Sequence, residues 1–230
     1  MIKAPLPLNE EIRLEALRRF HILDTEDEEV YDNITRLATH LCGVPISAVT
    51  LIDRDRQWFK SRVGLEMRET PRDLSFCAHA ILEPGIMLVP DTHKDIRFVD
   101  NPYVIEAPQF RFYAGAPLVT LEGNVLGMLC VMDNEPRTLL PEQIEALKAL
   151  SRHVICQMEM CHAVAGQGLV LATLEQAKQT AEDYQKLRSQ AATYIFETVP
   201  DKAYLSSDAA LARFYGYQTF EELAGILTDI

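Results

Sequence analysis

The chain has 230 residues, of which 48% are hydrophobic and 24% are charged. These proportions are ordinary for globular proteins and exclude disordered and fibrous classes, and the length suits one domain plus part of a second. The 34 acidic and 22 basic residues give a formal net charge of -12 at pH 7. Because this charge repels phosphate backbones and anionic lipid surfaces, we expect no nucleic-acid partner.

No run of the sequence approaches the roughly 18 apolar residues that a membrane-spanning helix needs, so no membrane segment is expected in this chain. Its start, Met-Ile-Lys-Ala-Pro-Leu-Pro, lacks the apolar block of a signal peptide. The predicted location is cytoplasmic. Five scattered cysteines lack the close pairs that bind zinc, so no metal site, structural disulfide or required cofactor is expected; they are Cys42, Cys77, Cys130, Cys156 and Cys161.

Two helices are predicted near the start of the chain. Asn9 is a suitable N-cap for a helix over residues 10–20, and Gly43 ends a second helix over about 27–41. Both helices carry an apolar stripe at three- and four-residue spacing. The first stripe consists of Ile12, Leu14, Leu17 and Phe20, and the second of Val30, Ile34, Leu37, Ala38 and Leu41.

Four segments have the composition of β-strands. Residues 46–53 are apolar and β-branched on both alternating faces, which predicts a central strand covered on both sides. Residues 57–63 are its expected antiparallel partner. Segments 111–120 and 125–133 form a second predicted pair, because the turn between them contains glycine and asparagine. A largely antiparallel sheet of five or six strands follows.

Residues 71–108 depart from this regular pattern. A short helix is predicted at 73–82 and a strand at 86–89, followed by the turn-rich stretch 91–102. Such a long irregular segment inside a compact domain usually carries function. Polar side chains beside apolar strands suit a pocket for a small, partly charged ligand.

Six residues are the candidates for lining this pocket: Phe76, His79, Asp91, Phe98, Arg111 and Tyr113. Arg111 and Tyr113 point to one face of their strand, whereas Phe112 and Ala114 point to the other. Aspartate and asparagine also cap helices and set turns. We therefore expect at least half of the polar residues in this irregular segment to serve only its turns.

A long helix is predicted to begin at Pro141, a favoured residue for the first turn. Apolar residues recur at helical spacing as far as Cys161 and should cover one face of the sheet. Beyond a bend expected at Gly166 and Gly168, the spacing continues among charged residues as a weak coiled-coil signal. The expected oligomer is a parallel homodimer.

Seven motifs occur in the order typical of one family. They are ISAVTLID (46–53), QWFK (57–60), SFCAHA (75–80), VPD (89–91), RFVDNP (97–102), RFYAGAP (111–117) and LGMLCVMD (126–133). Together they resemble a GAF domain from about Glu28 to Met160. The resemblance implies an α+β fold, a six-stranded antiparallel sheet with helices on both sides. The N- and C-terminal helices would lie on one face, and a pocket for a small molecule on the other.

The end of the chain shows a second, shorter resemblance. Residues 204–217 and 219–223 are similar to the opening helices of a PAS domain. The chain then divides into an N-terminal helix (1–25), a GAF-like sensory domain (26–163), a helical linker and candidate coiled coil (164–198), and a truncated PAS-like start (199–230). We expect a longer natural protein with a kinase or cyclase output domain, of the sensor histidine kinase or cyclic-dinucleotide type.

No catalytic residue is assigned, because the sequence shows no glycine-rich phosphate loop and no supported Ser-His-Asp arrangement. Cys77 is the candidate for a covalent or redox role. Bilin-binding relatives typically place a cysteine directly before histidine, whereas Ala78 separates Cys77 from His79 here. Residues two apart on a helix point about 200° apart, so these two cannot share one metal ion. Reductases of this fold use paired cysteines, and Cys130 is the partner that could approach Cys77 across the pocket.

The predicted function is that of a regulatory sensor module. It would bind a small molecule or dimerise, and relay the change through its long helix to an output domain. Two alternatives remain open. One is a ligand-free dimerisation spacer with a closed pocket, and the other is a thiol-dependent redox enzyme built on the GAF fold.

Overall fold

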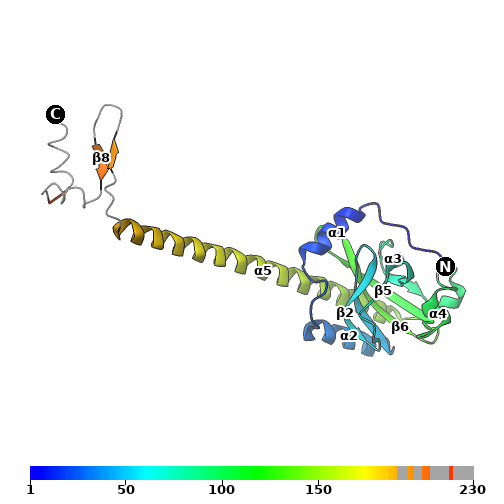
Figure 1. The fold of residues 1–230 in the computed structure, drawn as a ribbon. Helices are drawn as coiled ribbons and strands as arrows, with labels where there is room; N and C mark the ends of the chain where they lie inside the picture. The colour runs from blue at the N-terminus through cyan, green and yellow to red at the C-terminus, as the bar shows by residue number, and fades with distance from the viewer. Residues whose placement is uncertain (191–195, 199–203, 208–217, 220–230) are drawn as a thin grey trace. The chain divides into compact units, whose positions relative to one another are not determined.

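A computed structural model describes residues 1–190, 196–198, 204–207 and 218–219 of the chain (Figure 1). The chain divides into two units, Met1–Gln167 and Gly168–Ile230. The first unit contains the sheet and its covering helices. The candidate site described below lies entirely within this unit.

The first unit is built on a six-stranded antiparallel sheet, as predicted. The strands follow the spatial order β3-β2-β1-β6-β5-β4. Their bounds are β1 Ile46–Ile52, β2 Arg56–Val63, β3 Glu69–Pro71, β4 Met87–Val89, β5 Phe112–Val119 and β6 Val125–Asp133. The two predicted strand pairs are thus joined through β1 and β6, the two central strands.

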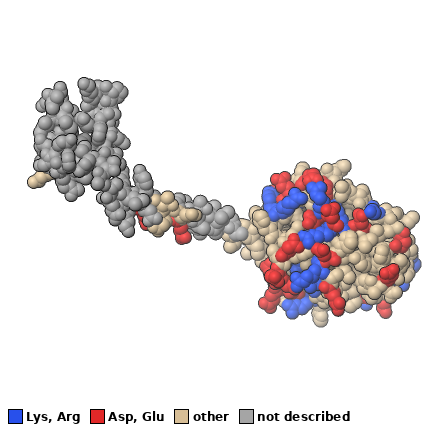
Figure 2. Space-filling view, viewed as in Figure 1, with Lys and Arg blue, Asp and Glu red and all other residues tan. Residues whose placement is uncertain are grey.

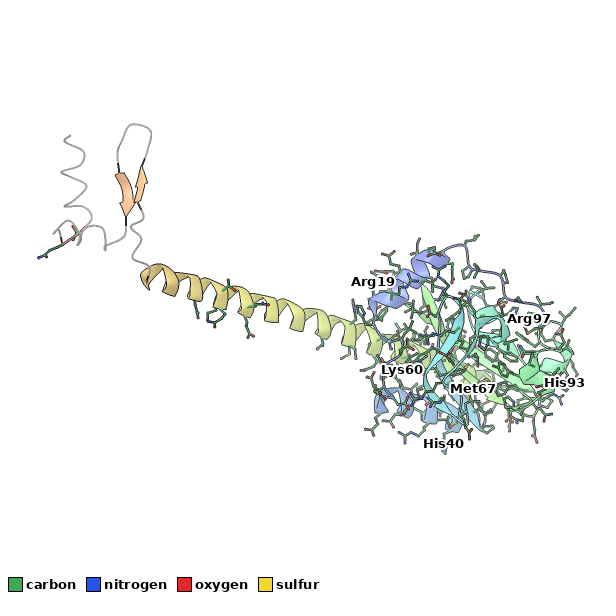
Figure 3. All side chains as sticks on the ribbon, viewed as in Figure 1. Arg19, His40, Lys60, Met67, His93 and Arg97 are labelled. Atoms are coloured by element: carbon green, nitrogen blue, oxygen red, sulfur yellow. The ribbon has the colours of Figure 1, made fainter. Side chains whose placement is uncertain are left out.

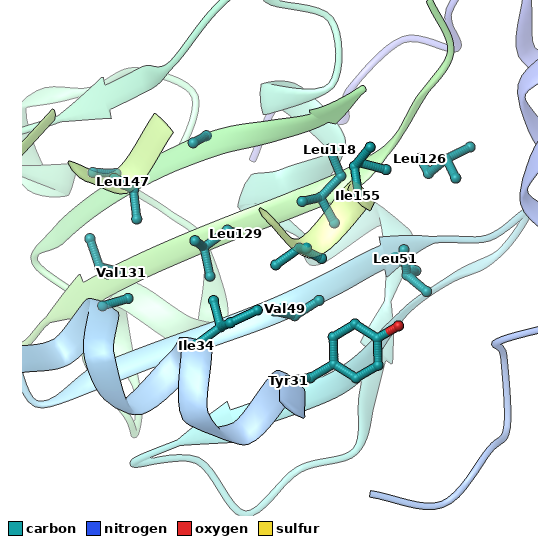
Figure 4. Close-up of a cluster of buried hydrophobic side chains, with 14 of the residues drawn as sticks. Tyr31, Ile34, Val49, Leu51, Leu118, Leu126, Leu129, Val131, Leu147 and Ile155 are labelled. Carbon is teal, nitrogen blue, oxygen red and sulfur yellow. The ribbon is translucent and has the colours of Figure 1, made fainter. Parts of the chain in front are cut away.

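Three helices lie against one face of the sheet: α1 (Glu10–Arg19), α2 (Glu29–Cys42) and the first part of α5 (Pro141–Gln190). Their apolar residues and those of the strands form one buried cluster (Figure 4). Ile34 of α2 and Leu147 of α5 meet Leu129 of β6 in this cluster. The helical spacing of these residues is what brings them to one face.

The opposite face is covered by short elements. These are η1 (Arg72–Leu74), α3 (Phe76–Ala80), η2 (Thr92–Lys94) and α4 (Pro102–Ile105). A second buried cluster, rich in aromatic and sulfur-containing side chains, fills this side. The predicted helix over 73–82 was too long, because Ser75 has extended backbone angles (φ -79°, ψ 129°) that separate η1 from α3.

Two predictions for the first helix need correction. Asn9 stands at the N-cap position, but its side chain forms no capping hydrogen bond; its Nδ2 donates to Oδ1 of Asn124 at 3.3 Å. Ile12 is 62% exposed, whereas Leu14 and Leu17 are buried. The second helix ends as predicted, with Gly43 in the left-handed region at φ 65°.

A buried lysine of β2 fastens the segment between α1 and α2 to the sheet. The Lys60 Nζ, completely buried, donates to Thr25 Oγ1 and to the Glu26 carbonyl oxygen, each at 2.7 Å, and pairs with Glu28 at 2.6 Å (Figure 3). On the visible surface of this unit, acidic and basic side chains are interleaved (Figure 2). Exposed pairs of this kind contribute roughly 0–1 kcal/mol each, so the buried lysine matters more.

The second unit contains the remainder of α5 and an antiparallel pair, β7 (Phe196–Thr198) and β8 (Tyr204–Ser207). Most of the predicted PAS-like segment, 208–217 and 220–230, lies outside the described residues. So do most side chains of the predicted coiled coil. Among the helices that the structure describes, none is both long and apolar enough to cross a membrane.

Candidate functional site

A small cavity lies on the sheet face that carries the short elements. Its volume is about 20 Å³, enough for roughly one water molecule. The lining is mostly apolar, with a few polar and sulfur atoms. The lining residues are Gln57, Phe59, Leu65, Met67, Thr70, Leu74, Ser75, Phe76, Cys77, Tyr103, Phe110, Tyr113, Cys130 and Met132.

An aromatic stack forms one side of this cavity. The ring of Phe76 stacks on Tyr113 with centroids 5.5 Å apart, and on Phe98 with centroids 4.4 Å apart. Phe110 meets Phe76 edge-on at 6.2 Å. Aromatic pairs of this kind contribute about 0.5–1.5 kcal/mol each beyond area burial. Phe76, Phe98 and Tyr113 are therefore in one packed group, but of these three predicted pocket residues only Phe76 and Tyr113 line the cavity, and Phe98 does not.

Polar contacts hold α3 in place above the cavity. The Ser75 hydroxyl caps the helix by accepting a hydrogen bond from the Ala78 N–H at 3.1 Å, and donates to the Gln57 side chain on β2. The Asn101 side chain donates to the Leu74 carbonyl oxygen at 2.9 Å. Capping by serine stabilises a helix start by about 1 kcal/mol. These bonds fix where Phe76 and Cys77 enter the cavity wall.

Two thiols meet at the bottom of this site. The Sγ atoms of Cys77 on α3 and Cys130 on β6 are 3.9 Å apart, and both side chains are buried. The Tyr113 hydroxyl donates to the Cys77 sulfur at 3.2 Å. Gly115 lies beside this tyrosine, where an added Cβ would be 2.3 Å from its hydroxyl oxygen and would displace the ring.

The surroundings shift the pKa values of the two cysteine thiols in opposite directions. Burial raises the pKa of the Cys77 thiol, but the contact with Cys130 and the hydrogen bond that the Tyr113 hydroxyl donates to the Cys77 sulfur lower it, and the balance lies below the ordinary value. The contact with Cys77 and burial together raise the pKa of Cys130 well above its ordinary value. Cys77 is therefore the better thiolate of the two.

His79 faces away from the cavity. Its Nε2 is hydrogen-bonded to the Ile2 carbonyl oxygen at 3.0 Å, and its ring meets Phe98 edge-on at 5.1 Å. Burial lowers the pKa of His79. In the same N-terminal segment as Ile2, Lys3 forms an ion pair with Asp73. His79 thus fastens the N-terminal residues across α3 and does not line the cavity.

Asp91 and Arg111 pair with each other at the end of β5. Arg111 Nη2 donates to Asp91 Oδ1 at 2.9 Å, and the same carboxylate caps η2 by accepting from the His93 N–H at 3.2 Å. Burial raises the pKa of Asp91, but the hydrogen bond from Arg111 lowers it, and the balance lies below the ordinary value. Neither residue lines the cavity. Asp91 and Arg111 therefore form an ion pair that holds the turn at η2 in place.

Sequence reasoning assigned Phe76 and Tyr113 to the pocket and named Cys77 and Cys130 as thiols that could approach across it, but it missed the other residues of the cavity lining. Gln57 and Phe59 on β2, and Cys130 and Met132 on β6, alternate with residues that face α2 and α5. The period-two pattern of these strands could have assigned them to one face. It could not show which face carries a cavity.

In the part of the chain that the structure describes, no cluster of three His, Cys, Asp or Glu side chains could hold a metal ion.

Comparisons with known proteins agree with this geometry. The GAF domain family model matches residues 27–157. A cyclic di-GMP phosphodiesterase of Pseudomonas aeruginosa strain PAO1 is 43% identical over 159 residues, which are 69% of this chain and 27% of that protein. The chain thus matches only about a quarter of that relative's length.

Solved structures support the same fold. The GAF domain of a phosphoenolpyruvate-protein phosphotransferase from Coxiella burnetii superposes with a TM-score of 0.52 at 13% identity, covering 67% of this chain and 96% of that one. Its counterpart from Acinetobacter gives a TM-score of 0.50 at 18% identity, covering 67% of this chain and 98% of that one. The chain belongs to the GAF domain family, whose members are typically sensory or regulatory modules of signalling proteins.

Proposed function

We propose that residues 27–157 form a sensory module that binds a small molecule between the sheet and α3. The observation that carries this proposal is an orphaned hydroxyl. Thr70 is 5% exposed and lines the cavity, yet its Oγ1 has no hydrogen-bond partner among the described residues. A buried hydroxyl without a partner costs about 1–3 kcal/mol, which a ligand atom or a water molecule would offset.

The lining indicates the chemistry of the ligand. Aromatic and aliphatic side chains supply most of the surface. The polar lining residues Gln57, Thr70 and Ser75 are neighbours, because Gln57 on β2 pairs with Thr70 on β3 and its side chain accepts a hydrogen bond from the Ser75 hydroxyl. A compact, mostly apolar molecule with one or two hydroxyl or carbonyl groups fits this pattern. The ion pair between Asp91 and Arg111 would remain outside the binding site.

Binding requires the cavity to open. Drug-sized ligands occupy pockets of roughly 300–1,000 Å³, whereas this one holds about 20 Å³. The side chains of Leu65 and Met67 are only partly buried against the cluster, so the segment between β2 and β3 can move with little loss of packing. A ligand would stabilise an open state that is sparsely populated without it.

The relay to α5 passes through the sheet. Cys130 faces the cavity, while its neighbour Val131 belongs to the cluster that includes Leu147 and Val154 of α5. A shift of β6 on the ligand side therefore changes the packing of α5 on the other. We propose that α5 carries this change onward through the linker (164–198) to the PAS-like segment (199–230).

The output proposed for the natural protein follows from its relative. Because a cyclic di-GMP phosphodiesterase shares 43% identity over 159 residues, we propose that this module regulates cyclic di-GMP hydrolysis. This proposed output differs from the kinase or cyclase expected from the sequence, although it is of the expected cyclic-dinucleotide type. The test is cyclic di-GMP hydrolysis by the full-length protein, with and without the ligand that the module retains.

A ligand-free dimerisation spacer is the second candidate, because the cavity is nearly filled by its own side chains. A second copy would pack on the groove between α2 and α5, lined by Val30, Asn33, Ile34, Leu37, Ala149, Leu150 and His153. Leu37 is 45% exposed there. Light scattering of the chain and of Leu37→Glu tests this: a dimer that the substitution dissociates supports the spacer.

Native mass spectrometry of the purified chain separates the two candidates. The sensor predicts a retained small molecule that is lost from Thr70→Val, a substitution that removes the orphaned hydroxyl and keeps the shape. Ser47→Ala is the matched control, since the Ser47 hydroxyl is equally buried and unpartnered among the described residues but does not line the cavity. Equal retention by Thr70→Val and wild type would contradict the proposed site, and no retained molecule in a dimeric chain would favour the spacer.

A further inference from the structure

We propose that Cys77 and Cys130 are a modification site at which a small peroxide forms a reversible disulfide between α3 and β6. The formation of this bond does not depend on a ligand for the cavity. The two cysteines lie 53 residues apart in sequence, and the fold brings their sulfur atoms to 3.9 Å. Nothing in their sequence spacing required this proximity.

The geometry needs only a small change. A disulfide has an S–S length of about 2.05 Å, so the sulfur atoms must approach by roughly 2 Å. Cys77 lies on a helix of five residues, α3, whereas Cys130 lies on a central strand. The short helix can move toward the strand without disturbing the β-ladder. The side chains themselves can also rotate about χ1 to shorten the distance.

The surroundings favour Cys77 as the attacking sulfur. The Tyr113 hydroxyl donates a hydrogen bond to its sulfur at 3.2 Å, which stabilises the thiolate form. Cys130 Sγ instead donates to the Ala48 carbonyl oxygen at 3.5 Å, which stabilises the protonated form. The pair therefore has one sulfur suited to attack and one that keeps its proton until the second step.

Access is the usual obstacle for a buried cysteine. Here both cysteines are among the residues that line the cavity of about 20 Å³. A space of that size admits a molecule of a few atoms, such as hydrogen peroxide, and excludes bulky alkylating reagents. Cys42 offers the contrast: it is buried on the other face, lines no such cavity, and burial raises its pKa to about 11.

The reaction balances with hydrogen peroxide as the oxidant. The Cys77 thiolate attacks one peroxide oxygen, an S–O bond forms and the O–O bond breaks. The departing hydroxide takes up the proton released from the Cys77 thiol and leaves as water. The Cys130 sulfur then attacks the Cys77 sulfenic acid, so that an S–S bond forms, the S–O bond breaks and a second water leaves. Two thiols lose two electrons, and one peroxide becomes two waters.

The disulfide would close the site. It fastens α3 to β6 across the cavity, so the space between α3 and the sheet could no longer widen for a ligand when the segment between β2 and β3 moves. This regulatory consequence rests on the proposed function, whereas the bond itself does not. Oxidation would then exclude the small molecule, and a thiol reductant would restore binding.

Peptide mapping of the full chain tests the bond. The native protein is treated with hydrogen peroxide, the peroxide is removed with catalase, and remaining thiols are alkylated in denaturant. We expect the loss of two hydrogen atoms and a cross-linked peptide pair that contains Cys77 and Cys130, reversed by dithiothreitol. Cys77 and Cys130 remaining as thiols while Cys156 or Cys161 is oxidised would overturn the proposal, as would cross-links to other cysteines.

Two further measurements sharpen the result. Cys130→Ser should leave the reaction at its first step, so that dimedone added in denaturant, after the peroxide is removed, traps a sulfenic acid on Cys77. A bulky organic peroxide should oxidise the wild-type pair more slowly than hydrogen peroxide does, since the cavity excludes it; equal rates would contradict access through the cavity.

If the disulfide forms but the oxidised chain keeps its retained small molecule, the regulatory consequence fails and the modification site stands.

Discussion

The two faces of the sheet differ in what their side chains can do. The face under α2 and α5 is covered mostly by aliphatic residues at regular helical and strand spacing, which form one buried cluster (Figure 4). The other face carries stacked aromatic rings, two thiols and an orphaned hydroxyl around a cavity. The first face therefore contributes most to stability in our account, whereas the proposed ligand and thiol chemistry lies on the second.

The largest effect is expected on the helix-covered face. Leu147 is completely buried within its cluster, so Leu147→Ala should lower the free energy of unfolding by about 4 kcal/mol through lost burial and the cavity left behind. Urea unfolding followed by the fluorescence of Trp58, the only tryptophan, measures this. Leu140→Ala is the control, because Leu140 is 62% exposed and should cost little. Equal losses would show that this face does not carry the stability.

A buried charge on the same face should rank second. Lys60→Met keeps most of the side-chain volume but leaves the Glu26 carbonyl oxygen and the Glu28 carboxylate without their donor. Hydrogen bonds to charged groups contribute about 1.5–3 kcal/mol, so a loss of about 2 kcal/mol is expected in the same urea assay. Lys94→Met removes a lysine that is 82% exposed and serves as the control. A neutral Lys60→Met would mean that hydrophobic burial compensates for the lost ion pair.

The outcome of these tests bears on what sequence alone can predict. The apolar run of β1 and the helical spacing of α2 were recognised because each pattern is local. The contact between Cys77 and Cys130 depends on which strands pair and where α3 lies, so it could not be derived from spacing. The ion pair between Asp91 and Arg111 was missed for the same reason, and both residues were assigned to the pocket instead.

Glu10 of the N-terminal helix makes the free energy of unfolding depend on pH. Burial raises the pKa of Glu10, but hydrogen bonds from Arg13 and Arg72 outweigh it and lower the pKa from 4.5 to about 2. Because the folded pKa is depressed, this stabilisation is present above pH 4.5 and is lost as the pH falls toward 2.

Glu10→Gln should therefore cost about 1.5 kcal/mol at neutral pH, and the difference from wild type should shrink between pH 4.5 and 2. Urea unfolding at a series of pH values measures this. Glu11→Gln is the matched control, since Glu11 pairs with Arg54 on the surface and its side chain is 72% exposed. A difference between Glu10→Gln and wild type that stays constant down to pH 2 would contradict the assignment.

The smallest effect on stability should come from the cavity face, and it separates chemistry from packing. Tyr113→Phe keeps the ring that stacks on Phe76 but removes the hydroxyl that donates to Cys77, so unfolding should become easier by only about 1 kcal/mol. Because that hydrogen bond lowers the pKa of Cys77, its loss should raise the pKa and shift the pH profile of peroxide oxidation to higher pH. Phe110→Leu is the control, because it alters the aromatic packing and leaves the hydroxyl in place. A profile that moves equally in both variants would mean that packing, and not the tyrosine hydroxyl, sets the reactivity of the thiol pair.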